Sequence, residues 1–130
     1  MICMQLKEEF FVSQERIAEI DLSSFRHNRM VLSKKADGRH LLLCLKAGAY
    51  GHGYETLLPA LSAQDQCWVA TLQEGIQLRT LGYQGGIVVN TTPISKAVLE
   101  ACIQYDLAWV LFSEDQLTAL QAFTSHKPLK

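Results

Sequence analysis

The chain has 130 residues, with 12 lysine and arginine residues, 13 aspartate and glutamate residues and a formal net charge of -1. Hydrophobic residues make up 48% of the sequence and charged residues 19%, which is typical of one soluble globular domain and not of a disordered chain. The balanced charge argues against nucleic acid or an anionic membrane as a partner, and no apolar run approaches the roughly 20 residues that span a bilayer.

The start of the chain and the cysteines bear on the compartment and on metal binding. Residues 1–11 lack the long apolar core of a secretory signal, so we expect a cytoplasmic protein. No two cysteines form a C-x-x-C pair, which argues against a zinc site and predicts no metal. Reduced thiols suit the cytoplasm. The cysteines are Cys3, Cys44, Cys67 and Cys102.

The first predicted elements are a helix and four strands. Asp21 or Ser23 is a suitable N-cap for a helix through about Lys35, with Phe25 and Leu32 facing inward. Four apolar runs follow, and each is typical of a strand that is buried on both faces. They begin about 20 residues apart, the spacing of βα units in a parallel sheet. The runs are residues 41–45, 67–71, 86–90 and 107–112.

Helices are predicted between these strands. The helix from about Tyr54 is expected to be short or kinked, because Pro59 lies inside it. Later helices begin at capping signals. These signals are Thr71 with Glu74, Thr92 with Pro93, and Ser113 with Gln116.

This order predicts an α/β fold that is the N-terminal half of a (β/α)₈ barrel of the TIM type. A closed barrel has eight βα units and typically about 250 residues. We therefore expect residues 17–130 to be a partial, truncated barrel domain and residues 1–16 an N-terminal extension. The exposed strand edges of such a half-barrel are an aggregation risk unless a partner covers them.

One strand end carries the chemistry. The run 41–45 leads directly into Lys46, and a glycine-rich turn with Tyr50 and His52 follows. Catalytic groups of such barrels lie at the carboxyl ends of the strands. Burial there disfavours the ammonium form of Lys46 and favours a nucleophilic amine that can form a Schiff base. On the pattern alone, Lys46 is also explained as a solvated boundary residue, and His52 is read as a hydrogen-bonded structural group.

Residues 46–53 resemble the cofactor-attachment signature of alanine racemases, and they read Lys-Ala-Gly-Ala-Tyr-Gly-His-Gly. The departure is Gly48, where the signature has asparagine or aspartate, so we expect a looser loop at Lys46. Residues 18–28 resemble the family's first strand and first helix. Residues 69–79 resemble the segment around its second barrel strand.

The resemblance implies a pyridoxal 5'-phosphate-dependent isomerase built on a PLP-binding barrel. Lys46 would be the Schiff-base lysine and one of two catalytic bases, and Tyr50 would donate to the cofactor phosphate. The family forms homodimers, acts on small amino acids and interconverts L- and D-alanine, which supplies D-alanine for peptidoglycan. The second base and most of the phosphate site have no counterpart in this sequence, so we expect the isolated chain to be inactive.

Two alternative functions fit the same residues. One is a broad-specificity amino-acid racemase of the same fold. The other is a non-catalytic, truncated remnant or assembly partner. Cofactor binding at Lys46 discriminates the enzyme readings from the remnant.

Overall fold

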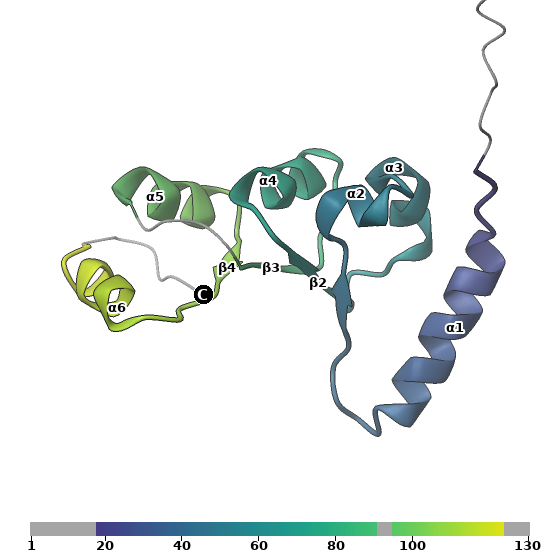
Figure 1. The fold of residues 1–130 in the computed structure, drawn as a ribbon. Helices are drawn as coiled ribbons and strands as arrows, with labels where there is room; N and C mark the ends of the chain where they lie inside the picture. The colour runs from purple at the N-terminus through teal and green to yellow at the C-terminus, as the bar shows by residue number, and fades with distance from the viewer. Residues whose placement is uncertain (1–17, 91–94, 124–130) are drawn as a thin grey trace, which may run out of the picture.

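The computed structural model describes residues 18–90 and 95–123, and its centre is a four-stranded parallel sheet (Figure 1). The strands lie in chain order, as consecutive βα units produce. They are β1 (Leu42–Cys44), β2 (Gln66–Val69), β3 (Gly86–Val89) and β4 (Ala108–Trp109). The predicted α/β fold and its four strands are confirmed, although β4 keeps two residues of the run predicted at 107–112.

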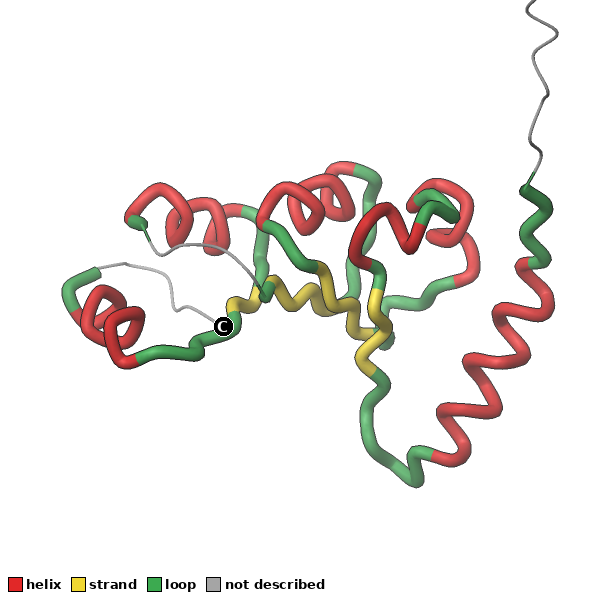
Figure 2. Tube along the Cα trace, viewed as in Figure 1, coloured by secondary structure: helices red, strands yellow, loops and turns green. Residues whose placement is uncertain are grey.

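Helical segments follow each strand (Figure 2), and α2, α4 and α5 lie along one face of the sheet (Figure 1). Within the described ranges, no helix combines the length and the apolar character needed to cross a membrane. The helical segments are α1 (Leu22–Lys35), α2 (Lys46–Tyr50), α3 (Tyr54–Leu57), the 3₁₀ turn η1 (Leu58–Ala60), α4 (Leu72–Thr80), α5 (Lys96–Gln104) and α6 (Glu114–Gln121).

The apolar runs predicted strands buried on both faces, but only one face of the sheet is buried in the structure. Side chains alternate between the faces along each strand. Cys67, Val69, Ile87 and Val89 have exposed fractions of 1% or less and form the core with the helices. Their neighbours on the other face are partly or largely exposed, and no helix of the described chain covers them in Figure 1. We call this the open face, and it is formed by Leu42, Cys44, Gln66, Trp68, Gly86, Val88 and Ala108.

Helix starts follow the capping chemistry closely. Asp21 caps α1, and Thr71 forms the predicted capping box with Glu74 at the start of α4. Ser113 caps α6, but its predicted box is incomplete, because the amide oxygen of Gln116 accepts from the backbone of Phe112. Each cap stabilises its helix, because it supplies acceptors for backbone N–H groups that have no partner within the helix.

The packed side of α1 and the start of α5 differ from the predictions. Leu32 was predicted to face inward but is 54% exposed, because the packed side of α1 is the one that carries Phe25 and Arg29. The predicted cap at Thr92 and Pro93 lies outside the described residues, and the described helix α5 begins after Ser95 as its N-cap. The interior proline acts as expected, since α3 ends at Leu57 and Pro59 lies in a 3₁₀ turn.

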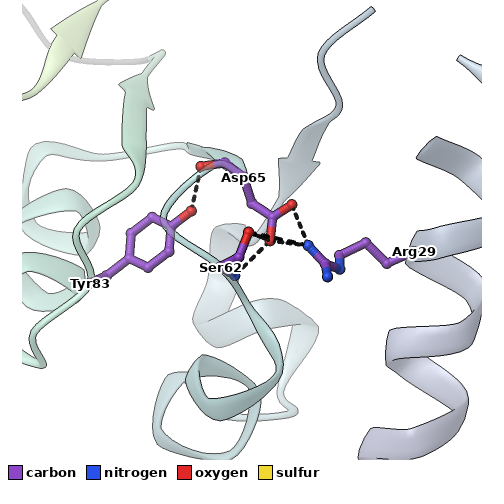
Figure 3. A network of polar contacts seen from close by, with 4 residues as sticks. All are labelled: Arg29, Ser62, Asp65 and Tyr83. Atoms are coloured by element: carbon purple, nitrogen blue, oxygen red, sulfur yellow. Dashed lines mark hydrogen bonds and ion pairs between the residues drawn. The ribbon is translucent and has the colours of Figure 1, made fainter. Parts of the chain in front are cut away.

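A polar network attaches α1 to the amino end of β2 (Figure 3). Arg29 donates to both carboxylate oxygens of Asp65, with the longer contact at 2.7 Å, and forms an ion pair with it. Asp65 also accepts from the backbone N–H of Ser62 at 2.7 Å. The buried hydroxyl of Tyr83 donates to the Asp65 carbonyl oxygen at 2.7 Å. One aspartate therefore joins α1, the loop before β2 and the loop before β3.

Asp65 predicts a loss of stability in acid. Burial of its carboxyl opposes ionisation, but the hydrogen bonds and charge of Arg29 and the Ser62 bonds outweigh burial and hold the pKa below its ordinary value of 3.8. The unfolded chain therefore binds more protons in mild acid than the folded chain does. We expect the Asp65 contribution to be complete above the ordinary pKa and lost as pH falls through the lowered folded value.

The measurement is the free energy of unfolding by denaturant at stepped pH. Asp65→Asn should be less stable near neutrality and should show a shallower decline in acid than the parent chain. Glu100→Gln is the matched control, because Glu100 is an exposed carboxylate whose ion pair with Lys96 spans 3.8 Å, so its loss should leave the acid slope at the parent value. Equal acid slopes for the parent and Asp65→Asn would contradict the assignment.

Candidate functional site

Lys46 lies at the carboxyl end of β1, where the sheet gives way to a turn. The backbone N–H of Leu45 still pairs with the Trp68 carbonyl oxygen of β2 at 2.8 Å, and the Leu45 side chain is buried in the core. The next side chain, Lys46, is half-buried. Its Nζ lies 5.7 Å from the ring centroid of Trp68 and 5.9 Å from that of Tyr50. The amine therefore lies within cation–π distance of two aromatic rings, and the ring of Trp68 belongs to the open face.

The turn after Lys46 is left-handed. Ala47, Gly48 and Ala49 have φ/ψ of 54/47°, 61/41° and 55/47°, and Tyr50 has φ 55°. Such a run costs roughly 1–2 kcal/mol for each residue with a side chain, and strained backbone of this kind gathers at functional sites. The sequence predicted a glycine-rich turn here but not its handedness.

Gly48 suits this conformation. Glycine adopts positive φ without strain, and asparagine and aspartate are the side-chain residues that tolerate it best. A Cβ at this position would meet no heavy atom within 4 Å. The replacement of the signature's asparagine or aspartate by Gly48 therefore fits the backbone, while the looser loop stays a prediction.

The Glu74 carboxylate of α4 accepts a hydrogen bond from the turn. Its Oε1 accepts from the Ala47 N–H at 2.6 Å, and its Oε2 accepts from the N–H groups of Ala70 and Thr71 at 2.8 and 3.0 Å. The sequence identified Glu74 as a capping residue through the T-x-x-E spacing. It did not identify the contact with Ala47, because that contact depends on β1 and β2 being neighbours.

Tyr50 presents its hydroxyl at the surface of the site. The side chain is 60% exposed, and its Oη lies 3.3 Å from the Cys44 Sγ. The hydrogen bond with Cys44 raises the pKa of Tyr50, and the small burial and the Cys44 charge add to the rise. The phenol is therefore protonated at neutral pH and available as a hydrogen-bond donor.

His52 has the structural role that the sequence favoured. Its Nδ1 lies 2.7 Å from the carbonyl oxygen of Ala49, and because a carbonyl can only accept, this nitrogen carries the proton. The Gly51 N–H donates to Ala47 and the Gly53 N–H to Gly48, at 3.0 and 2.9 Å. These bonds stabilise the left-handed turn from within residues 47–53.

A groove of about 420 Å³ lies beside the turn, between β1, α2 and the start of α1. Tyr50, Cys44 and His52 line one side, and Asp21 and Asn28 of the α1 segment line the other. Lys46 does not line the groove. Tyr50 therefore borders both the groove and the amine, and a ligand group in the groove could reach the Tyr50 hydroxyl.

The chain is similar in sequence to alanine racemases. The profile of the family described as "Alanine racemase, N-terminal domain" matches residues 20–130. The chain is 35% identical over 114 residues to an alanine racemase of Xanthomonas oryzae pv. oryzae, covering 87% of this chain and 31% of that protein. It is 34% identical over 113 residues to the catabolic alanine racemase of Pseudomonas aeruginosa, covering 86% of this chain and 31% of that protein.

Solved structures agree with the sequence relatives. Alanine racemase from Corynebacterium glutamicum superposes with a TM-score of 0.72 at 31% identity, over 82% of this chain and 32% of that one. Alanine racemase from Acinetobacter baumannii gives 0.73 at 29% identity, over 79% and 31%. The chain thus spans about a third of the length of the relatives that it matches.

Proposed function

Because the chain belongs to the alanine racemase family, we propose that it supplies the lysine side of the active site of a pyridoxal-phosphate-dependent amino-acid racemase. The position of Lys46 carries this proposal. It is a lysine at the carboxyl end of a parallel strand, where barrel enzymes hold their catalytic groups, and its amine lies within cation–π distance of two aromatic rings.

The residues around Lys46 fit the cofactor. A primary amine can bond covalently to an aldehyde, and the protonated phenol of Tyr50 can donate to a phosphate oxygen. Lys46 and Trp68 are both partly exposed at the open face, so a ligand can approach the amine from that side. When bound, pyridoxal phosphate serves as an electron sink that stabilises negative charge at the substrate Cα.

In this proposal Lys46 moves the proton. Its neutral amine takes the proton from Cα on one face of the substrate, and its ammonium returns a proton to that face in the reverse direction. Inversion also needs a second base on the opposite face. We propose that this base comes from outside the described residues, as part of a longer or dimeric assembly acting on alanine or another small amino acid.

Labelling with pyridoxal phosphate tests the assignment. The purified chain is mixed with less than one equivalent of pyridoxal phosphate and reduced with borohydride, and the modified lysines are located by mass spectrometry. We expect the label to concentrate on Lys46, at least about tenfold above any other lysine, because its surroundings hold the cofactor. Lys46→Ala should abolish the concentrated label.

Lys96→Ala is the matched control. Lys96 is an exposed lysine on α5 that forms an ion pair with Glu100 of the same helix at 3.8 Å, so its loss should leave the labelling of Lys46 unchanged. Label spread evenly over the lysines, or the same total label in Lys46→Ala, would show that this chain resembles the family without holding its cofactor. That outcome would favour the non-catalytic reading.

A further inference from the structure

The Glu74 carboxylate does more than cap its own helix. The capping box uses Oε2, which accepts from the N–H groups of Ala70 and Thr71. Oε1 is then left to accept from Ala47, 27 residues earlier in the chain, at 2.6 Å. A bond to a charged acceptor at this distance is among the strong hydrogen bonds of proteins. Glu74 therefore ties the start of α4 to the turn after β1.

The hydrogen bond from Ala47 to Glu74 lies directly after Lys46 in the chain. Ala47 is the first left-handed residue of the turn and directly follows Lys46. A left-handed run in L-residues persists only where the surroundings enforce it. The peptide between Lys46 and Ala47 has a single donor, the Ala47 N–H. Glu74, from the neighbouring βα unit, accepts a hydrogen bond from it.

The geometry points to Glu74 as a positioning residue for Lys46, an inference that rests on the proposed function. By holding the Ala47 N–H, the carboxylate fixes the direction in which the chain leaves Lys46 and keeps its amine over Trp68. The Glu74 carboxylate contacts backbone N–H groups, so we assign it a positioning role and not a catalytic one. It acts through the backbone, and half of its carboxylate is committed to that task.

The test compares Glu74→Gln with Thr71→Val in the full chain. The glutamine side chain has one acceptor oxygen in place of two and cannot serve both sets of N–H groups. Thr71→Val removes the hydroxyl that accepts from the Glu74 N–H but leaves the carboxylate intact. Amide hydrogen exchange at Ala47, relative to Val69 in β2, reports the bond. The upfield shift of the Lys46 ε-methylene protons over the Trp68 ring reports the position of the amine.

We expect Glu74→Gln to speed Ala47 exchange by about tenfold or more relative to Val69, and to remove most of the ring-induced shift at Lys46. Thr71→Val should leave both near the parent values. If Glu74→Gln does not fold, Glu74→Asp replaces it, because aspartate keeps the charge at the start of α4 but is one methylene too short for Ala47. Unchanged exchange and an unchanged Lys46 shift would overturn the inference.

Pyridoxal phosphate labelling then separates this inference from the proposed function. If Lys46 of the parent chain takes the label, Glu74→Gln should lower the labelling several-fold while Thr71→Val does not. If the parent chain is not labelled, the cofactor assignment fails, while the exchange and shift measurements, made without cofactor, still decide whether Glu74 positions Lys46.

Discussion

Gly85→Ala should destabilise the chain by about 3 kcal/mol, although it adds one methyl group. A Cβ at Gly85 would lie against the Tyr83 hydroxyl and the Asp65 carbonyl oxygen, closer than non-bonded atoms approach. These two atoms share a buried hydrogen bond, so the methyl group must both displace packed atoms and break that bond. Neither partner can move easily, because the Asp65 carboxylate is held by Arg29 at the same time (Figure 3).

The next residue provides the control. A Cβ at Gly86 would first meet the Gln66 side chain, 3.3 Å away, which is exposed and flexible, so Gly86→Ala should cost less than about 1 kcal/mol. Denaturant unfolding followed by tryptophan fluorescence measures both. Adding Tyr83→Phe to Gly85→Ala should cost less than the sum of the two changes, because both act on one bond. Strict additivity, or equal losses at Gly85 and Gly86, would show that the clash relaxes elsewhere.

Arg79→Met should cost about 3 kcal/mol, because one guanidinium joins the loops before two strands. Its Nη1 donates to the carbonyl oxygens of Tyr83 and Gly85, both at 2.7 Å, ahead of β3. Its Nε and Nη2 donate to Tyr105 and Asp106, both at 2.9 Å, ahead of β4. Methionine keeps much of the stem but leaves these carbonyl groups without their charged donor.

Two variants test this explanation by the same unfolding measurement. Arg79→Lys should recover only part of the loss, because an ammonium cannot reproduce the planar fork of the guanidinium. Arg26→Met removes an exposed arginine that donates to one carbonyl, of Pro59 at 3.0 Å, and should cost less than about 1 kcal/mol. Arg26→Met as damaging as Arg79→Met would mean that lost side-chain packing, and not the four carbonyl contacts, sets the effect.

The residues that stabilise the fold and the residue proposed for chemistry lie at opposite ends of the strands. Asp65, Tyr83, Gly85 and Arg79 all act at the amino ends of β2, β3 and β4. Lys46 lies at the carboxyl end of β1. This division is general for barrel-type folds, in which the amino-terminal face supports stability. Changes at the amino ends should therefore lower the fraction of folded protein without altering the proposed chemistry of the molecules that remain folded.

Much of the fold could be predicted from short-range patterns. Apolar runs predicted the strands because each strand is covered on at least one face, and the T-x-x-E spacing predicted the start of α4 because its bonds are local. The prediction that Leu32 faces inward was wrong because it depended on long-range contacts. Helical periodicity shows which residues share a side of α1, but the side that packs is decided by contacts such as Arg29 with Asp65, 36 residues away.

Some residues of the candidate site could be predicted from the sequence, and others could not. Lys46 and Tyr50 could be named from one continuous motif, and His52 from its place in a turn. Glu74 and Trp68 could not be placed beside Lys46, because their proximity follows from the register that pairs Cys44 with Trp68. The left-handed turn was also out of reach, since a single glycine among Ala47, Ala49 and Tyr50 does not specify positive φ for all four residues.

That turn reverses an ordinary preference of the polypeptide. At positive φ and ψ a D-amino acid is relaxed and its L counterpart is strained, so the chirality that suits the rest of the chain is the disfavoured one at Ala47. Ala47 is exposed, so packing does not compensate. Semisynthesis with D-alanine at this position would relieve the strain without adding an atom. Evolution has no such residue available, which leaves glycine, asparagine and aspartate as the least strained choices in the turn and β-branched residues as the worst.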